Sequence, residues 1–391
     1  MVSALLAGAC TSLPPPPQPA YAAAPPCSTP AATIAFDFEG ASQSRCIIKG
    51  EREFTILVGP EHAPPINPSP WYAFRYDIDQ GDDVTVSLEY LAGSHRYPPK
   101  LQASGKSVRI DAEVSENRNR ASFDIPPGSG RVSGQEIFAS ERYSQMFNQL
   151  RRYSFVDIEV IGHSLGGRPI DAVRMGRPSA PNLIVLLGRA HPPEVSGAVA
   201  MEAFLDELAL LYAGGDIDAD NIQILAVPLL NPDGVARGHW RANLGGIDLN
   251  RDWGNFSQPE TRAVGEWLDR LEPAVSPIAM IDFHSTRRNL FYVQGPDETD
   301  ARQEQFLNEW LGQMLVSVDG YPFTIERRNA NPGSGTSKNW FHSKYGIPAY
   351  TYEVGDNSDR MTILSAARTF AGLLPPAVSK SLLDKPPPRS R

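Results

Sequence analysis

The sequence has no long apolar run, no excess of basic residues and too few cysteines for a disulfide framework. No run of 18 apolar residues occurs, so we expect no transmembrane helix. Acidic residues outnumber basic ones by 45 to 36, and the net charge of −9 without a basic stripe argues against nucleic-acid binding. The three cysteines, Cys10, Cys27 and Cys46, lack CxxC spacing, which excludes a cysteine zinc site. One bridge between Cys27 and Cys46 remains possible.

The overall composition is that of a globular protein. Of the 391 residues, 41% are hydrophobic and 21% are charged, and the length suggests two or three domains. The first nine residues are mostly apolar or small and lead into Ala-Gly-Ala-Cys10, which resembles a bacterial lipobox. We therefore expect a periplasmic protein or a lipoprotein anchored through Cys10, although Ala7 replaces the usual leucine and a basic start is missing. A cytoplasmic protein with an apolar tail is the alternative.

Changes in composition divide the chain into four segments. Residues 1–31 hold the lipobox-like start and a proline-rich linker. Residues 32–130 contain runs of alternating apolar and polar residues, such as 84–90 and 108–114, and predict a small β-sandwich domain. Residues 131–378 form a third segment with a different pattern, in which the candidate site residues described below lie, and residues 379–391 are a proline-rich tail.

The third segment alternates continuous apolar runs with helical patterns. The runs start near residues 182, 222, 279 and 349 and are typical of strands buried on both faces. Helices are expected over 199–212, 259–271 and 302–316, the second of them with Ser257 as a candidate N-cap. This alternation predicts an α/β fold with a mixed, mostly parallel sheet and helices on both faces. Ligands bind at the carboxyl ends of strands in such sheets.

The segment GHSLGG at residues 162–167 matches the nucleophile motif of serine hydrolases, which needs a strand, a sharp turn and then a helix. No helix is expected here, because Gly-Arg-Pro and a second alternating run follow. We therefore interpret the segment as the turn of a β-hairpin, and not as a site for a nucleophilic Ser164.

Three residues near the ends of two apolar runs form a candidate metal site. His191 and Glu194 follow the run that ends at Gly188, and their spacing allows both to bind one cation from a tight loop. His284 lies at the end of the run that starts near residue 279. Two histidines and one carboxylate, with a position left for water, are a ligand set of catalytic zinc.

Further polar residues lie between and after these three. The segment NPDG at 231–234 ends a run in a tight turn, and Arg241, Asp248, Asn250 and Arg251 follow shortly afterwards. Glu353 ends the run that starts at residue 349, and its carboxylate should therefore lie at a strand end beside the candidate metal site.

The motifs HPPE, NPDGVARGHWRANLGGIDLNRDW, DFHST and YTYEVGD occur in an order that resembles the zinc carboxypeptidase family over about residues 150–375. The β-rich segment with WYAFRYDI resembles the amino-terminal domain of the cytosolic carboxypeptidases and their bacterial relatives. This resemblance implies a zinc-carboxypeptidase-like fold, one Zn²⁺ per chain, and hydrolysis of the C-terminal peptide bond of peptides or proteins.

The resemblance implies His191, Glu194 and His284 as the zinc ligands. Glu353 would then be the general base and acid, which takes a proton from the zinc-bound water and delivers it to the leaving amine. A buried carboxylate paired with an arginine is the alternative for Glu353.

The same resemblance implies roles for the residues between these ligands. Arg241, with Arg237 as the fallback, would stabilise the oxyanion. Asn250 and Arg251 would bind the C-terminal carboxylate of the substrate, because a guanidinium binds carboxylates with two parallel hydrogen bonds. Asp248 would orient a zinc-binding histidine, and a turn cap is its alternative.

Lys338 lies 15 residues before Glu353, where the family has the residue of its side-chain pocket. A lysine there would favour an acidic C-terminal residue, unless its side chain points into solvent. Seven residues earlier, Asn331 replaces a mobile tyrosine of the digestive enzymes, so another group would have to serve or the rate would differ.

Two further functions stay open. A zinc amidase or peptidase that acts on peptidoglycan stem peptides would share the fold and the metal, and an exported location would favour it. A catalytically silent binding protein is a different class, although every expected catalytic side chain except the tyrosine is present.

Overall fold

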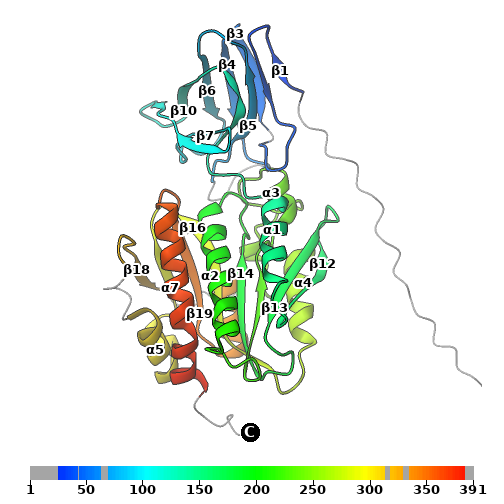
Figure 1. Ribbon diagram of the computed structural model, residues 1–391, viewed down its shortest axis with the longest axis vertical. Coiled ribbons are helices and arrows are strands. Elements are labelled where there is room, and N and C mark those ends of the chain that lie inside the picture. The colour runs from blue at the N-terminus through cyan, green and yellow to red at the C-terminus, as the bar shows by residue number, and fades with distance from the viewer. Residues whose placement is uncertain (1–24, 43, 63–68, 313–317, 329–333, 384–391) are drawn as a thin grey trace, which may run out of the picture.

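The computed structural model describes residues 25–42, 44–62, 69–312, 318–328 and 334–383, which form an all-β domain and an α/β domain (Figure 1). Cys10 and Asn331 lie outside the described residues. The all-β domain packs against the end of the α/β domain that carries the short helix α3 (Pro232–Ala236), and Gly40 N–H donates to the Ala236 carbonyl across this boundary at 2.9 Å.

Two sheets form the all-β domain. The first has the order β1-β2-β5-β11-β7-β8, and the second has the order β3-β4-β6-β10-β9. The first sheet consists of β1 (Cys27–Ser28), β2 (Ala32–Ala35), β5 (Ala73–Ile78), β11 (Gly128–Ser133), β7 (Lys100–Ala103) and β8 (Lys106–Arg109). The second consists of β3 (Arg45–Gly50), β4 (Glu53–Val58), β6 (Val84–Tyr90), β10 (Arg120–Ile125) and β9 (Glu113–Val114). This all-β region before the α/β domain is the one that the sequence predicts.

The alternating pattern over 84–90 forms β6, in which Val84, Val86 and Leu88 are buried in the domain core. The expectation of one strand over 108–114 is wrong. β8 ends at Arg109 in the first sheet and β9 begins at Glu113 in the second, so the chain crosses between the sheets. These short strands lie at the sheet edges, which leaves Val108 and Val114 exposed.

Cys27 of β1 and Cys46 of β3 form a disulfide that links the two sheets, with their Cα atoms 5.8 Å apart. Ordered structure therefore begins before residue 32: Cys27 and Ala31 are buried. At the other end, β11 continues past residue 130 to Ser133, because its last residues pair with β5 and β7.

The α/β domain contains an eight-stranded sheet of order β12-β13-β15-β14-β16-β19-β17-β18. The four central strands β15, β14, β16 and β19 are mutually parallel, as is the outer pair β17–β18, and the other pairings are antiparallel. The strands are β12 (Val156–His163), β13 (Pro169–Met175), β14 (Asn182–Gly188), β15 (Ile222–Val227), β16 (Ser276–Thr286), β17 (Leu290–Val293), β18 (Thr324–Arg327) and β19 (Ala349–Gly355).

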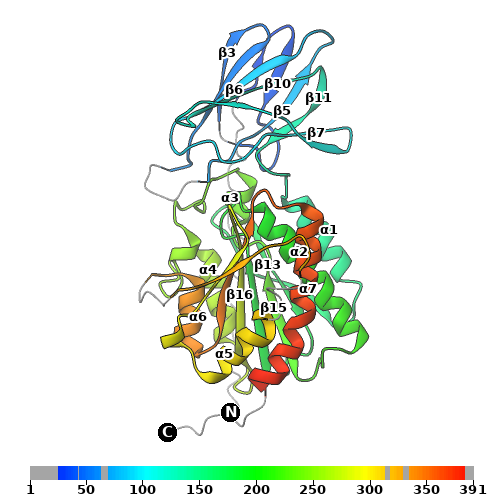
Figure 2. The same ribbon diagram turned by 90° about the vertical axis from the view of Figure 1, so that its left-hand side faces the viewer.

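Helices cover both faces of this sheet (Figure 2). One face carries α1 (Ser140–Leu150), α2 (Val195–Gly214), α5 (Ala301–Leu307) and α7 (Arg360–Val378), and the other carries α4 (Pro259–Asp269) and α6 (Ser337–Tyr345). In β14, Ile184 and Leu186 point into the first core, and Leu183, Val185 and Leu187 point into the second. The continuous apolar run is explained by this burial on both sides, and the predicted fold class is confirmed.

Two of the expected helices differ in detail. The N-cap of α4 is Gln258 and not Ser257, because the Ser257 side chain donates to Asp252 instead. The helix expected over 302–316 is α-helical only to Leu307 and continues as a π-helical turn over Asn308–Gly312.

The final helix and its π-helical end, Arg360–Leu383, are long and apolar enough to cross a membrane by length and composition alone. Half of its most apolar window is buried, and Ile363, Phe370 and Leu374 lie in the core beneath α2. We interpret it as a core helix, which passes the same test.

The GHSLGG segment is the turn of the β12–β13 hairpin, as predicted. The Ser164 hydroxyl accepts the Arg168 N–H at 3.0 Å, and no helix follows the turn. Ser164 therefore lacks the strand–turn–helix geometry of a hydrolase nucleophile.

We expect the double substitution Cys27→Ser, Cys46→Ser to lower the free energy of unfolding of the all-β domain by about 3 kcal/mol, because a bridge across 19 residues restricts the unfolded chain. Urea titrations followed by circular dichroism measure the change. Reduction should lower the free energy of unfolding of the natural chain to that of the variant, and it should leave the variant unaffected. Equal midpoints for oxidised, reduced and substituted protein would contradict the prediction.

Candidate metal centre and active-site cleft

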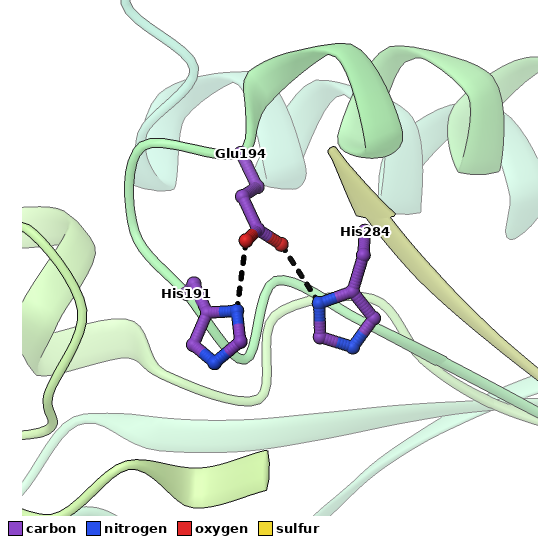
Figure 3. A group of neighbouring side chains, drawn as sticks. All are labelled: His191, Glu194 and His284. Atoms are coloured by element: carbon purple, nitrogen blue, oxygen red, sulfur yellow. Dashed lines mark hydrogen bonds and ion pairs between the residues drawn. The ribbon is translucent and has the colours of Figure 1, made fainter. Parts of the chain in front are cut away.

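Three buried side chains converge at the carboxyl ends of two neighbouring strands (Figure 3). His191 and Glu194 lie in the loop between β14 and α2, and His284 lies near the end of β16. His191 Nδ1 is 2.8 Å from Glu194 Oε1, and His284 Nδ1 is 2.8 Å from Glu194 Oε2. One ligand atom from each residue lies within 4.8 Å of the others, so the structure brings the three predicted ligands together.

The loop that carries His191 and Glu194 is held in a tight conformation. Arg189 adopts a left-handed φ of 56°, and its Nε donates to the Pro192 carbonyl at 2.8 Å. In the first turn of α2, a Cβ on Gly197 would lie 2.5 Å from the His284 carbonyl oxygen. Only glycine permits this approach, which brings the start of α2, and with it Glu194, against the end of β16.

The outward nitrogen of each histidine meets a second carboxylate. His191 Nε2 lies 2.9 Å from Asp248 Oδ1, and His284 Nε2 lies 3.0 Å from Asp282 Oδ2. Carboxylates in this position orient metal-binding histidines and keep the other nitrogen directed at the metal. The sequence interpretation missed Asp282. Its spacing of two residues from His284, which places both on one face of a strand, could have identified it.

The charge around the cluster fits a cation. Burial would by itself lower the pKa of His284, but the Asp282 and Glu194 carboxylates outweigh burial and raise that pKa well above its ordinary value. The pKa of His191 is raised in the same way by Glu194 and Asp248, against burial and Arg241. The cluster therefore favours positive charge at its centre, and two imidazoles with one carboxylate suit zinc.

Glu353 lies in β19 directly beside His284 of β16 in the parallel register. Its Oε2 is buried, with no hydrogen-bond partner among the described residues. Burial raises the pKa of Glu353 to about 7; Glu194 adds to the rise, and His284 and His191 oppose it. A carboxyl group with a free oxygen and a pKa near neutrality can both accept and release a proton.

Arg241 and Asp248 are linked to the same cluster. Arg241 Nε donates to Asp248 Oδ2 at 2.8 Å, so the Asp248 carboxylate connects the arginine to His191. Arg241 is buried and lines the cleft. The fallback candidate, Arg237, is the C-cap of α3 and is not among the cleft residues.

Asn250 and Arg251 lie in the 3₁₀ turn η1 (Leu249–Arg251) and both line the cleft. The Asn250 amide is engaged: its Oδ1 accepts the Ser337 N–H at 3.0 Å, and its Nδ2 lies 3.3 Å from His284 Nε2. The more exposed Arg251 donates to the Asn250 carbonyl at 2.6 Å.

Lys338 lies in the first turn of α6 and also lines the cleft. Its Nζ donates to the Arg328 carbonyl at 3.0 Å, so the ammonium is held inside the protein and does not extend into solvent. Burial lowers the pKa of Lys338 to about 8, which leaves most of the side chain charged at neutral pH.

One cleft of about 590 Å³ is lined by the three candidate metal ligands together with Glu353, Arg241, Asn250, Arg251 and Lys338. The all-β domain contributes Ser69, Pro70, Ser94 and Arg96 to its wall. Among the described residues, six cationic side chains line it, against the two carboxylates of Glu194 and Glu353; the six are Arg96, Arg241, Arg251, Arg287, Arg328 and Lys338. Cationic side chains therefore outnumber carboxylates in this lining, in a chain whose net charge is −9, although Arg96, Arg241 and Arg328 are paired with carboxylates outside it.

Solved structures share this architecture. A metallo-carboxypeptidase from Burkholderia cenocepacia superposes with a TM-score of 0.73 at 18% identity, over 90% of this chain and 99% of that chain. A Pseudomonas aeruginosa metallo-carboxypeptidase, solved with (2-guanidinoethylmercapto)succinic acid, gives a TM-score of 0.68 at 18% identity, over 89% and 99% of the two chains. At this identity the likeness establishes the fold.

Proteins with similar sequences include a carboxypeptidase as well. Cytosolic carboxypeptidase 2 of Danio rerio is 28% identical over an alignment of 238 residues, and the match covers 55% of this chain and 33% of that protein. An uncharacterized protein of Zymomonas mobilis is 32% identical over an alignment of 214 residues, and the match covers 51% of this chain and 53% of that protein. The matched region thus spans between a third and about half of these relatives.

The zinc carboxypeptidase family model matches residues 143–379, which is more than half of the chain and includes every candidate site residue. The chain belongs to the zinc carboxypeptidase family.

Proposed function

We propose that this protein is a zinc-dependent carboxypeptidase that removes the C-terminal residue of peptides or proteins. One observation carries the proposal: the His191–Glu194–His284 cluster lines the same cleft as Glu353, whose Oε2 has no hydrogen-bond partner in the part of the chain that the structure describes. Family membership supports it, because the chain retains both the predicted metal ligands and the predicted base.

Each group has a place in the reaction. Zinc, when bound by the cluster, supplies Lewis-acid chemistry that polarises a carbonyl and makes water more acidic. Glu353 accepts the proton of the attacking water and delivers it to the leaving amine, for which a pKa near 7 is suited. Arg241 donates to the carbonyl oxygen as its charge develops. Arg251 binds the substrate's C-terminal carboxylate, and Asn250 orients this turn through Ser337.

We further propose that the enzyme prefers acidic C-terminal residues. The cationic lining of the cleft and the buried Lys338 ammonium support this preference. The relatives named above do not favour the amidase alternative, because the Danio rerio protein and the two solved structures carry the name carboxypeptidase.

An exported location, with a lipid anchor on Cys10, is also a proposal. The Cys27–Cys46 bridge supports export, since disulfides persist mainly in oxidising compartments. Alkylation of protein taken from its own cells tests it, and free thiols at both positions would argue for a reducing compartment.

Metal removal should abolish cleavage, and zinc should restore it. Zinc should also stabilise the fold by about 2.7 kcal/mol once its free concentration is a hundred times Kd, measured as a rise in Tm. His191→Ala should lose this zinc-dependent rise, while His163→Ala, at an exposed position on β12, should keep it. A zinc response that survives His191→Ala would place the metal elsewhere.

Glu353→Gln should lower kcat by about 10²–10⁴-fold while zinc content stays near one per chain, because the amide cannot accept the proton. Mass spectrometry of a peptide with a free C-terminus, and of its amidated form, measures the activity. Glu266→Gln on the exposed face of α4 serves as the matched control and should be as active as the natural chain. Near-normal activity of Glu353→Gln would remove Glu353 from the mechanism.

Lys338→Met should reduce the preference for peptides ending in Glu over those ending in Phe by roughly 10–100-fold, because it removes a charged partner of the acidic side chain. The Lys338 ammonium is charged below its pKa of about 8, so KM for Glu-ending peptides should rise as pH increases through 8. Lys338→Arg should flatten that rise. Equal kcat/KM for the Glu and Phe peptides in the natural chain would refute the pocket, and cleavage confined to a diaminopimelate stem peptide would favour the amidase.

A further inference from the structure

A carboxylate of the all-β domain holds the backbone beside Arg241. Glu61, which follows β4 in the chain, accepts three consecutive backbone N–H groups: Trp240 at 2.7 Å on Oε2, and Arg241 at 3.0 Å and Ala242 at 2.6 Å on Oε1. Burial by itself would raise the pKa of Glu61, but the N–H groups of Trp240 and Ala242, together with His239, outweigh burial and lower it. The side chain is therefore an anion at neutral pH.

The segment that Glu61 holds has no regular secondary structure of its own. Residues 237–247 connect α3 to η1 without a helix or a strand. Three successive N–H groups that point the same way form an anion-binding concavity, and here the anion comes from the other domain. Without it these donors would be left unpaired in a partly buried loop, at a cost for each.

The two ends of Arg241 are thus fixed by different carboxylates. Glu61 fixes the backbone, while Asp248 fixes the guanidinium through Nε at 2.8 Å. Asp248 in turn contacts His191 at 2.9 Å, so a continuous chain of contacts runs from the all-β domain to the candidate metal ligands.

We propose that Glu61 is a positioning residue, through which the all-β domain sets the position of Arg241 in the cleft. The inference rests on the proposed carboxypeptidase function and gives the all-β domain a part in it. Preorganised donors stabilise developing charge because they need no reorientation during the reaction, so a mobile Arg241 would lose most of its effect.

The test uses the full chain and a matched control. Glu39 also accepts hydrogen bonds across the domain boundary, from Arg168 at 2.9 Å and from Ser140, and neither of these partners belongs to the segment 240–248. Glu61→Gln should lower kcat about 10–100-fold on a Glu-ending peptide and change KM less than about twofold. Glu39→Gln should leave both within about twofold, and Glu61→Asp, which keeps the charge, should lose less than Glu61→Gln.

A double-mutant cycle separates positioning from general support of the fold. In an Arg241→Gln background, Glu61→Gln should cause no further loss of kcat, because the group that it positions is already gone. The proposal would be overturned if Glu61→Gln lowered kcat equally in the natural chain and in the Arg241→Gln background. It would also be overturned if Glu39→Gln lowered kcat as much as Glu61→Gln.

Hydrogen exchange tests, independently of activity, whether Glu61 holds the backbone of residues 240–242. Backbone N–H groups of residues 240–242 should exchange at least about tenfold faster in Glu61→Gln, and at an unchanged rate in Glu39→Gln, measured by mass spectrometry on peptides from this segment. If the zinc-loaded natural chain cleaves no peptide, the proposed function fails. Unchanged exchange of these N–H groups in Glu61→Gln would separately refute the role of Glu61 in holding the segment.

Discussion

The buried cluster of carboxylates around two histidines imposes the strictest constraint on this structure. Glu194 contacts the inward nitrogens of His191 and His284, and Asp248 and Asp282 contact the outward ones. Charges removed from water are costly unless each is paired with good geometry. The loop before α2, the end of β16 and the turn η1 must therefore all converge within a few ångströms, and the sheet and its helices provide the rigid frame that holds them.

The parallel centre of the sheet explains why these residues meet. Carboxyl ends of parallel strands lie along one edge, and the β16–β19 register places Glu353 directly beside His284. The close approach at Gly197 adds the third element, because α2 can then bring Glu194 to the same edge. The positions of the candidate site residues therefore depend on the two apolar cores that pack against the faces of β14.

The all-β domain contributes part of the cleft lining. Arg96 bonds Asp356, which follows β19, at 2.8 Å, and it lines the cleft together with Ser69 and Ser94. The lining of the cleft therefore comes from both domains, and each of them contributes cationic side chains. This arrangement is the reason that the charge of the cleft cannot be inferred from the net charge of the chain.

The sequence by itself determined the apolar runs, and through them the strands, the fold class and the strand-end positions of His191, Glu194, His284 and Glu353. Such signals are local, since burial on two faces leaves a continuous run of apolar residues. It failed over 108–114, where an alternating pattern spans two edge strands of different sheets, and it did not distinguish the α-helix that ends at Leu307 from the π-helical turn that continues it over Asn308–Gly312. Only the tertiary structure decided that Asp282 supports His284, that the Asn250 amide is already engaged and that Glu61 holds the segment with Arg241. The last two depend on contacts between residues far apart in the chain, whose pairing is set by packing and leaves no periodic trace in the sequence.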